Sequence, residues 1–247
     1  MISLKKIIAE GRYDSLVTEL SRKLLKVVKD SYAAVSDPKG EFAGKHIYYT
    51  KTESTPHIES IDEIYFLEVD NKTIPLEFYL TLKVQWIDGL GDFRHGGDAY
   101  NETKPESDDM PLIEVRFEID PADYPNILSE VAMQLRDILR HEIEHLTQSG
   151  WNTNPDKYIA SDQTLRRKIE AGKLPAARYF TLPKETPAMI QGLYMKAKKS
   201  RTAFRDVVDN YLSVWVKNGT ITDTEKQQIL DTWRSYLPKL GIRQELQ

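Results

Sequence analysis

The stretch from residue 128 to residue 146 constrains the fold more than any other part of the chain. Its apolar residues recur at spacings of three and four: Leu128, Val131, Ala132, Leu135, Ile138, Leu139, Ile143 and Leu146. This period gives an α-helix a wide apolar face, so the stretch predicts a buried helix of about 20 residues. Asn126 or Pro125 can open this helix, and Gly150 lies where a left-handed C-terminal cap is expected.

Within this helix, residues 141–145 read His-Glu-Ile-Glu-His, which is the pattern HExxH. Residues four apart stack on one helix face, so His141 and His145 can bind one metal ion. Glu142, beside the first histidine, can then act on a water molecule at that metal. Both histidines share a stripe with Ile138 and should point inward. The alternative is a helix that binds no metal, with two partly buried histidines whose hydrogen bonds are satisfied and an exposed Glu142. This alternative is costly in free energy because it buries two imidazoles without a ligand.

A catalytic zinc site needs three protein ligands, and Glu185 is the candidate for the third. It heads a predicted helix in which Glu185, Met189, Leu193 and Ala197 form one stripe. A carboxylate at the head of an apolar stripe points inward and needs a cation or a donor as partner. The alternative is an acid that only interacts with the helix dipole. Three further carboxylates are rival ligands: Asp156, Asp162 and Glu170.

The remaining periodicities predict an α+β chain. An amphipathic helix is expected over residues 15–35, and alternating apolar residues predict strands over 45–50, 63–69, 76–86 and 111–120. Further helices are expected at 184–200, 202–217 and 223–237, the last with a capping box from Thr222 to Glu225. The simplest organisation is one domain over 1–247, with an N-terminal helical segment (1–40), a catalytic core (41–200) and a C-terminal helical extension (201–247).

Residues 88–110 form a long connection that contains His95 and several Gly, Asp and Glu residues. Structureless connections rarely exceed about 12–15 residues, so this loop is either a mobile flap or a disordered insertion. His95 could ligate a metal, although a histidine in a loop is more often exposed to solvent.

Composition and charge narrow the possible functions. The net charge is −4 and the pI is near 5.8, which argues against a general nucleic-acid binder. The basic run at 196–201 is expected to be a solvated helix face. Because the chain has no cysteine, any metal must be held by histidine and carboxylate.

No apolar run is long enough for a signal peptide or a membrane span, so we expect an intracellular protein without a membrane partner. The oligomeric state is not predicted.

The HExxH helix, the strand before it and Glu185 about forty residues later resemble the zincin metallopeptidases, in particular the branch with a glutamate as third ligand. The resemblance covers residues 111–200. It implies a zincin-like fold, zinc (Zn2+) on His141, His145 and Glu185, Glu142 as general base, and residues 111–119 as the edge strand that binds a peptide. The chain departs from the family in two ways. The residues after His145 lack the Gly and the third His that follow the motif in metzincins. No Tyr or His stands at a defensible spacing for stabilising the transition state, and Tyr179 and Tyr194 are the candidates considered for that role.

We therefore expect a zinc metallopeptidase that acts on a peptide or protein substrate. The start of the chain, residues 4–14, resembles the starts of proteins encoded by tailed phages, which implies the host cytoplasm or the virion as its location. Two alternatives remain at this stage. One is a non-catalytic assembly protein, for example of a phage particle, that has a zincin fold and a metal that stabilises this fold. The other is a helical interaction module that docks a partner through Trp215, Trp233 and Tyr236, although these aromatics have core-like spacing.

The charged residues around the motif are expected to be peripheral. Glu144 can orient a ligand imidazole or face solvent, and the solvated position is favoured. Arg136, Asp137 and Arg140 are expected to form a pattern of surface charges on the same helix.

Overall fold

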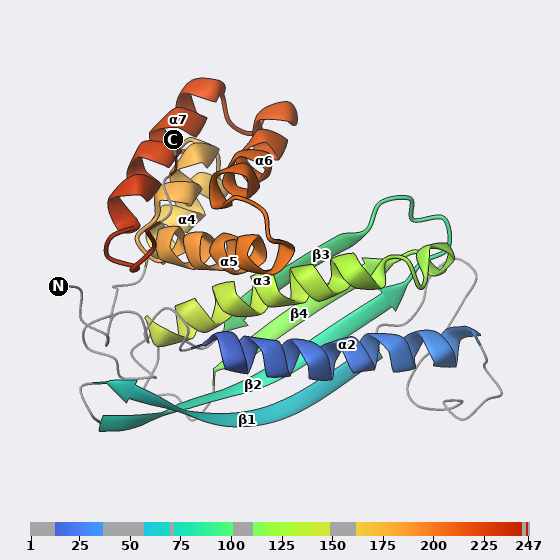
Figure 1. Cartoon of the computed structure of the whole chain (residues 1–247). Coiled ribbons are helices and arrows are strands. Elements are labelled where there is room, and N and C mark those ends of the chain that lie inside the picture. The colour runs from blue at the N-terminus through green and yellow to red at the C-terminus, as the bar shows by residue number, and fades with distance from the viewer. Residues whose placement is uncertain are drawn as a thin grey trace.

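The computed structural model describes residues 13–36, 57–69, 72–100, 111–148, 162–243 and 246 of the chain. In this part the protein is α+β, as expected (Figure 1). The elements in chain order are α2 (Asp14–Ser36), β1 (His57–Val69), β2 (Lys72–Trp86), β3 (Arg94–Tyr100), β4 (Leu112–Ile119), α3 (Leu128–Thr147), α4 (Gln163–Glu170), α5 (Glu185–Ser200), α6 (Phe204–Lys217) and α7 (Asp223–Tyr236), with short 3₁₀ turns η1 (Pro121–Asp123) and η2 (Ala176–Thr181).

The strands form a four-stranded mixed sheet in the order β1-β2-β4-β3. The pairs β1/β2 and β3/β4 are antiparallel, and β2 and β4 run parallel. In the shared register Val115 of β4 lies between Leu82 of β2 and Gly97 of β3. The strand at 111–119 was expected at the edge of the sheet, and this expectation is wrong. β4 is internal because β3, from the predicted loop at 88–110, covers its outer side.

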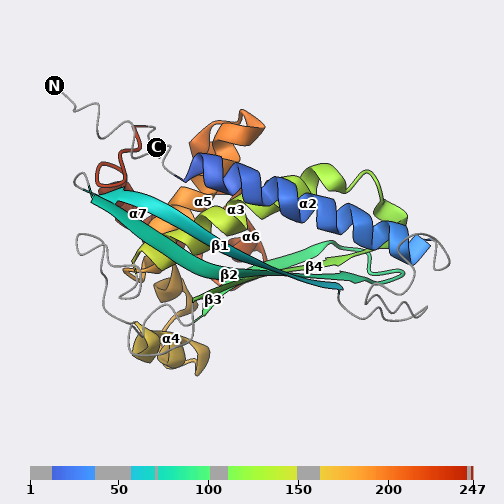
Figure 2. The ribbon, with the colours of Figure 1, turned by 90° about the horizontal axis from the view of Figure 1, so that it is seen from below.

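Helices α2 and α3 cover one face of this sheet, and the main core lies between the two layers (Figures 1 and 2). The alternating residues of β4 that face this core are all buried: Ile113, Val115, Phe117 and Ile119. Fully burying a side chain of this size stabilises the fold by about 1.5–3 kcal/mol. The indole of Trp86 in β2 donates to Ser31 Oγ in α2 at 2.9 Å, which ties the helix to the sheet.

A second cluster of buried side chains lies among η2, α5, α6 and α7. Trp233 of α7 is fully buried in this cluster, and its indole nitrogen donates to the carbonyl of Phe180 at 2.7 Å. Trp215 and Tyr236 pack against this cluster from partly buried positions. The aromatics of the C-terminal region therefore serve internal packing, as their spacing indicated. Helix α5 joins the two cores, since Met195 belongs to the first and Met189 to the second.

Local sequence signals explain several helix ends. The capping box at the start of α7 is present: Glu225 N donates to Thr222 Oγ1 at 3.2 Å, and Thr222 N donates to Glu225 Oε2 at 2.8 Å. Helix α3 starts after Ile127, so neither Asn126 nor Pro125 is its N-cap. The expected strand at 45–50, Gly150 and Asp156 lie outside the described residues, as does most of the 4–14 segment. Within the described part of the chain, no helix is both long and apolar enough to span a bilayer.

Candidate metal centre

Helices α3 and α5 pack side by side and bring His141, His145 and Glu185 together. One ligand atom from each of the three side chains lies within 4.8 Å of those of the other two. The two Nε2 atoms are 3.1 Å apart, and the Glu185 carboxylate lies 3.5 Å from His141 Nε2 and 3.4 Å from His145 Nε2. The group expected from the sequence is therefore assembled, and its atoms are close enough to share one metal ion.

The surroundings of Glu185 fit a bound cation. Its side chain is 0% exposed, and Oε2, which faces His141, makes no hydrogen bond to any described residue. Burial by itself raises the pKa of this carboxyl, but the two imidazoles outweigh burial and hold the pKa well below its ordinary value. A buried carboxylate needs charge compensation, and two histidine nitrogens plus one carboxylate form a donor set that zinc prefers.

The position of Glu185 follows from the stripe that it heads. Met189, Leu193 and Ala197 are buried below it, so the first turn of α5 presents the carboxylate to α3. Arg166 of α4 holds the same carboxylate from the other side by donating to Oε1. This guanidinium also binds Asp162, with 2.9 Å from Nε to Oδ1. The ring of Tyr179 lies 5.9 Å from the guanidinium carbon.

The two rival ligands that the structure describes, Asp162 and Glu170, do not join this group. Asp162 is engaged by Arg166, and Glu170 is exposed on α4. His95 lies on β3, is exposed to solvent as expected, and is not part of the cluster. Among the described residues, only Glu185 completes the pair of histidines.

Glu142 is buried, so the alternative in which Glu142 is exposed to solvent is wrong. Burial is the largest influence on this carboxyl and raises its pKa, while His141 and His145 act in the opposite direction. Strand β3 approaches this carboxylate closely. A Cβ at Gly97 would lie 3.2 Å from Glu142 Oε1 and only 2.2 Å from a methyl carbon of Ile138. The absence of a side chain at Gly97 therefore allows β3 to lie against the helix next to Glu142.

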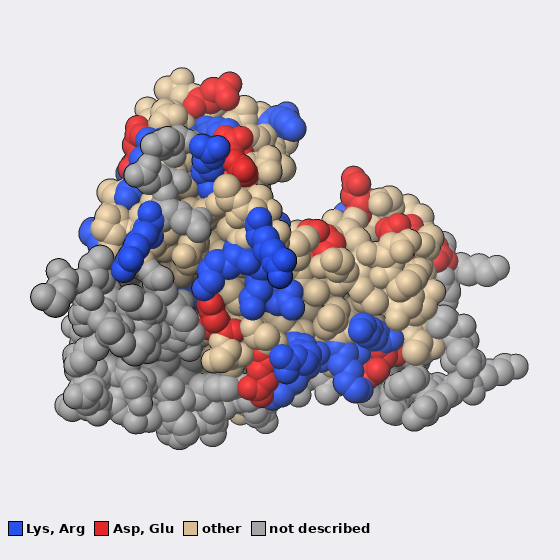
Figure 3. All heavy atoms as spheres, in the orientation of Figure 1, with Lys and Arg blue, Asp and Glu red and all other residues tan. Residues whose placement is uncertain are grey.

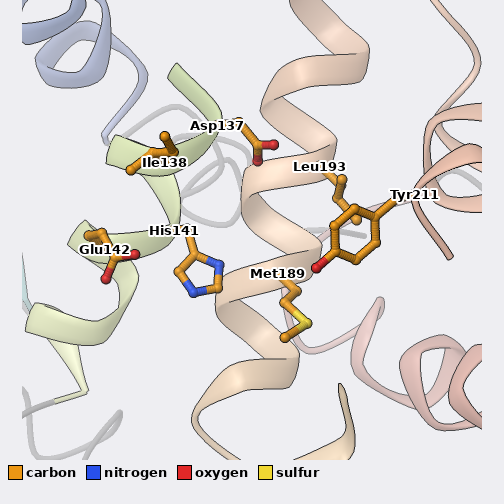
Figure 4. Close-up of a pocket in the computed structure, with 7 residues that line it drawn as sticks. All are labelled: Asp137, Ile138, His141, Glu142, Met189, Leu193 and Tyr211. Atoms are coloured by element: carbon orange, nitrogen blue, oxygen red, sulfur yellow. The ribbon is translucent and has the colours of Figure 1, made fainter. Parts of the chain in front are cut away.

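A pocket opens beside His141 and Glu142, with a volume of about 100 Å³. Its walls come from three helices, and the residues are Asp137, Ile138, His141, Glu142, Met189, Leu193 and Tyr211 (Figure 4). The hydroxyl of Tyr211 points toward the side on which His141 lies. Burial and the charge of Asp137 raise the pKa of Tyr211, which keeps its hydroxyl a neutral donor.

Tyr211 was not expected from the sequence, and the two tyrosines considered there do not line the pocket. Tyr179 lies beside Arg166 and Glu185, and Tyr194 packs edge-on against Phe204 at 5.4 Å. Tyr211 stands on α6, after a helix–helix connection whose packing angle no local pattern reveals. The sequence held no signal that could have selected it.

The charged residues around the motif are less peripheral than expected. Glu144 is buried and accepts a hydrogen bond from Arg140 Nη1 at 3.0 Å, so the favoured solvated position is wrong. Arg140 is buried as well, and Asp137 lines the pocket. The expectation that Arg140 and Asp137 belong to a pattern of surface charges is therefore wrong. Arg136, which is partly buried, donates to the carbonyl of Ala132 at 3.1 Å.

The basic run at 196–201 is a solvated helix face for the most part. Lys198, Lys199 and Arg201 are exposed, and Lys198 binds Asp14 of α2 at 2.7 Å. Figure 3 shows that Lys and Arg side chains gather over the C-terminal part of α5 and along α2, with acidic side chains among them.

No family model, no curated protein and no solved structure matches this chain.

Proposed function

We propose that the protein is a zinc-dependent metallopeptidase with a zincin-like active site. The observation that carries the proposal is the convergence of His141, His145 and Glu185 from two helices, with Glu142 adjacent and a pocket beside it. His141, His145 and Glu185 would hold the zinc. In this site zinc would supply a Lewis acid that polarises a carbonyl and acidifies a water molecule.

Glu142 is the general base in this proposal. Its carboxylate takes a proton from the attacking water and gives it to the amine that leaves. Its burial favours this role, because a raised pKa brings a carboxylate closer to the pH at which it can both accept and return a proton. Tyr211 is the candidate donor to the oxygen on which negative charge develops, since its neutral hydroxyl lines the same pocket.

The peptide substrate is proposed to add to β3, one of the two edge strands of the described sheet. Within the described sheet β3 pairs with β4 alone, so none of the described strands lies on its outer side, where a peptide could add as a further strand. Gly97 brings this edge next to Glu142, which would place a scissile bond near the base. This assignment replaces the edge strand expected at 111–119.

Metal content tests the site. Elemental analysis of protein purified without chelators should find about one zinc per chain, and His145→Ala and Glu185→Ala should each lose it. Glu170→Ala is the control, because this exposed carboxylate was a rival ligand and lies outside the cluster. Zinc retained in Glu185→Ala would exclude Glu185 as a ligand, and wild-type protein without metal would refute the zinc centre.

Turnover tests the reaction. Glu142→Gln should keep its zinc and its thermal transition but lose cleavage of a peptide that the wild type hydrolyses. Cleavage retained in Glu142→Gln would refute the base. Zinc bound without cleavage of any peptide in a broad synthetic library would favour the alternative of an assembly protein whose metal stabilises the fold. The phage origin and the location in the host cytoplasm or the virion remain predictions.

A further inference from the structure

One acidic group in the pocket beside His141 has no part in the proposed mechanism. Asp137 precedes His141 by one turn of α3, and its carboxylate points into the space between His141 and Tyr211 (Figure 4). Gly192 of α5 makes room for it, since a Cβ there would lie 2.4 Å from Asp137 Oδ1. The carboxylate therefore occupies space that any other residue at 192 would fill.

This carboxylate lacks a close partner. No hydrogen bond or ion pair to Asp137 occurs within the ranges that the structure describes, and the residue is only partly exposed. Burial raises the pKa of Asp137, and the charges of Lys196 and His141 offset this in part. A carboxylate that is only partly exposed and has no bonded partner is poorly compensated, and a cation that enters the pocket would provide the missing partner.

The other walls suit an alkyl chain. Ile138, Met189 and Leu193 contribute aliphatic surface, and Tyr211 contributes an aromatic ring. A cavity of about 100 Å³ holds one extended side chain rather than a larger ligand. A pocket with apolar walls and a carboxylate accommodates the amphipathic side chains of lysine and arginine, whose stems are apolar and whose ends are charged.

We propose that this pocket recognises a Lys or Arg side chain next to the scissile bond of the substrate, and that Asp137 binds its charge. The inference rests on the proposed peptidase function, because the pocket lies beside His141 and Glu142. It names the substrate class: peptides and proteins cleaved beside a basic residue. A neutral side chain of the same length would contact the apolar walls of the pocket but leave the carboxylate of Asp137 without a partner.

Cleavage specificity is the first test. A synthetic peptide that the wild type cleaves is varied at each position flanking the scissile bond, with Lys, Arg, norleucine and Glu in turn. At one position Lys and Arg should give a kcat/KM about tenfold or more above norleucine. Asp137→Asn should reduce this ratio to about twofold or less, and Asp137→Lys should favour Glu. Asp206→Asn, which removes an exposed carboxylate on α6, is the control and should keep the wild-type ratio.

A binding measurement separates this inference from the peptidase proposal. Zinc-loaded wild type is titrated with N-acetyl-lysine methylamide and with the norleucine analogue, followed by NMR shifts of the pocket methyl groups. The wild type should bind the lysine compound several-fold more tightly than the norleucine compound. Asp137→Asn should bind the two compounds equally, and the thermal transition of this variant shows that it is folded. If the wild type cleaves without a preference for basic residues, or if Asp137→Asn keeps that preference, the proposed recognition of Lys or Arg is overturned but the proposed peptidase function is not. Lysine selectivity without any cleavage supports the pocket and overturns the peptidase.

Discussion

Arg140 Nη1 donates to Glu144 Oε2 at 3.0 Å across one turn of α3, and the two side chains are 4% and 2% exposed. The guanidinium also lies 4.9 Å from the ring centre of Tyr13, just before α2. The ion pair therefore lies inside the molecule, on the helix that carries the HExxH motif and against the segment that opens α2.

Loss of one partner of this pair should be costly. Glu144→Ala leaves a buried guanidinium without its carboxylate, so the free energy of unfolding should fall by about 3–5 kcal/mol. Denaturant unfolding measures this change. The matched control is Glu19→Ala, which breaks the exposed i,i+4 pair with Lys23 (3.3 Å) and should cost less than about 1 kcal/mol. A loss in Glu144→Ala as small as that in Glu19→Ala, below about 1 kcal/mol, would show that the Arg140–Glu144 pair does not stabilise the fold.

The approach of β3 to α3 should tolerate no side chain at Gly97. Gly97→Ala would place a Cβ 2.2 Å from Ile138 Cγ2, so the strand or the helix must shift. Overpacking of this kind costs about 1–3 kcal/mol, and the shift should also reduce turnover because Glu142 lies at the same contact. Gly96→Ala is the control: its nearest neighbour would be the flexible end of Arg116 at 3.8 Å. Thermal unfolding and peptide cleavage of both variants check the prediction, which fails if Gly97→Ala behaves like Gly96→Ala.

Zinc should stabilise the folded chain. A ligand that binds only the folded state at a hundred times its dissociation constant contributes about 2.7 kcal/mol. Addition of zinc to chelator-treated protein should therefore raise the Tm, and renewed chelation should lower it. Glu185→Ala should show a much smaller rise, since the buried carboxylate that faces both imidazoles is gone. An identical rise in Glu185→Ala would place the stabilising zinc elsewhere on the molecule.

Removal of the Tyr211 hydroxyl should slow the reaction without loss of metal. Tyr211→Phe keeps the ring that packs 6.3 Å from both Phe180 and Trp215, so the fold should be retained. The kcat should fall by about tenfold to a hundredfold if the hydroxyl stabilises the developing charge. Tyr194→Phe, on a residue outside the pocket, is the comparison. An unchanged kcat in Tyr211→Phe, with zinc at the wild-type level, would remove this residue from the mechanism.

Much of the secondary structure could be predicted from local patterns. The helix expected at 15–35 spans Asp14–Ser36, and the three C-terminal helices start within a few residues of their expected positions. β3 was missed because Arg94–Tyr100 is polar and rich in glycine. Such a strand forms only because β4 supplies hydrogen-bond partners along its whole length.

The candidate site was predictable to the extent that helical spacing dictates it. A separation of four residues aligns His141 with His145, and the stripe below Glu185 directs its carboxylate inward, because both follow from the period of a single helix. Burial of Glu144 and Arg140 was not predictable in this way. A charge pattern on a helix looks the same whether solvent or another helix lies beside it.

The sequence by itself determined a buried helix with two aligned imidazoles, a carboxylate at the head of another apolar helix, and an α+β chain, since each depends on interactions between residues near in sequence. Only the tertiary structure decided that β3 rather than β4 lies at this edge of the sheet, that Arg166 holds Glu185, and that Asp137 and Tyr211 share a pocket with the motif. The physical reason is that contacts between distant segments depend on how helices and strands pack, and this packing minimises the free energy of the whole chain rather than of any one segment.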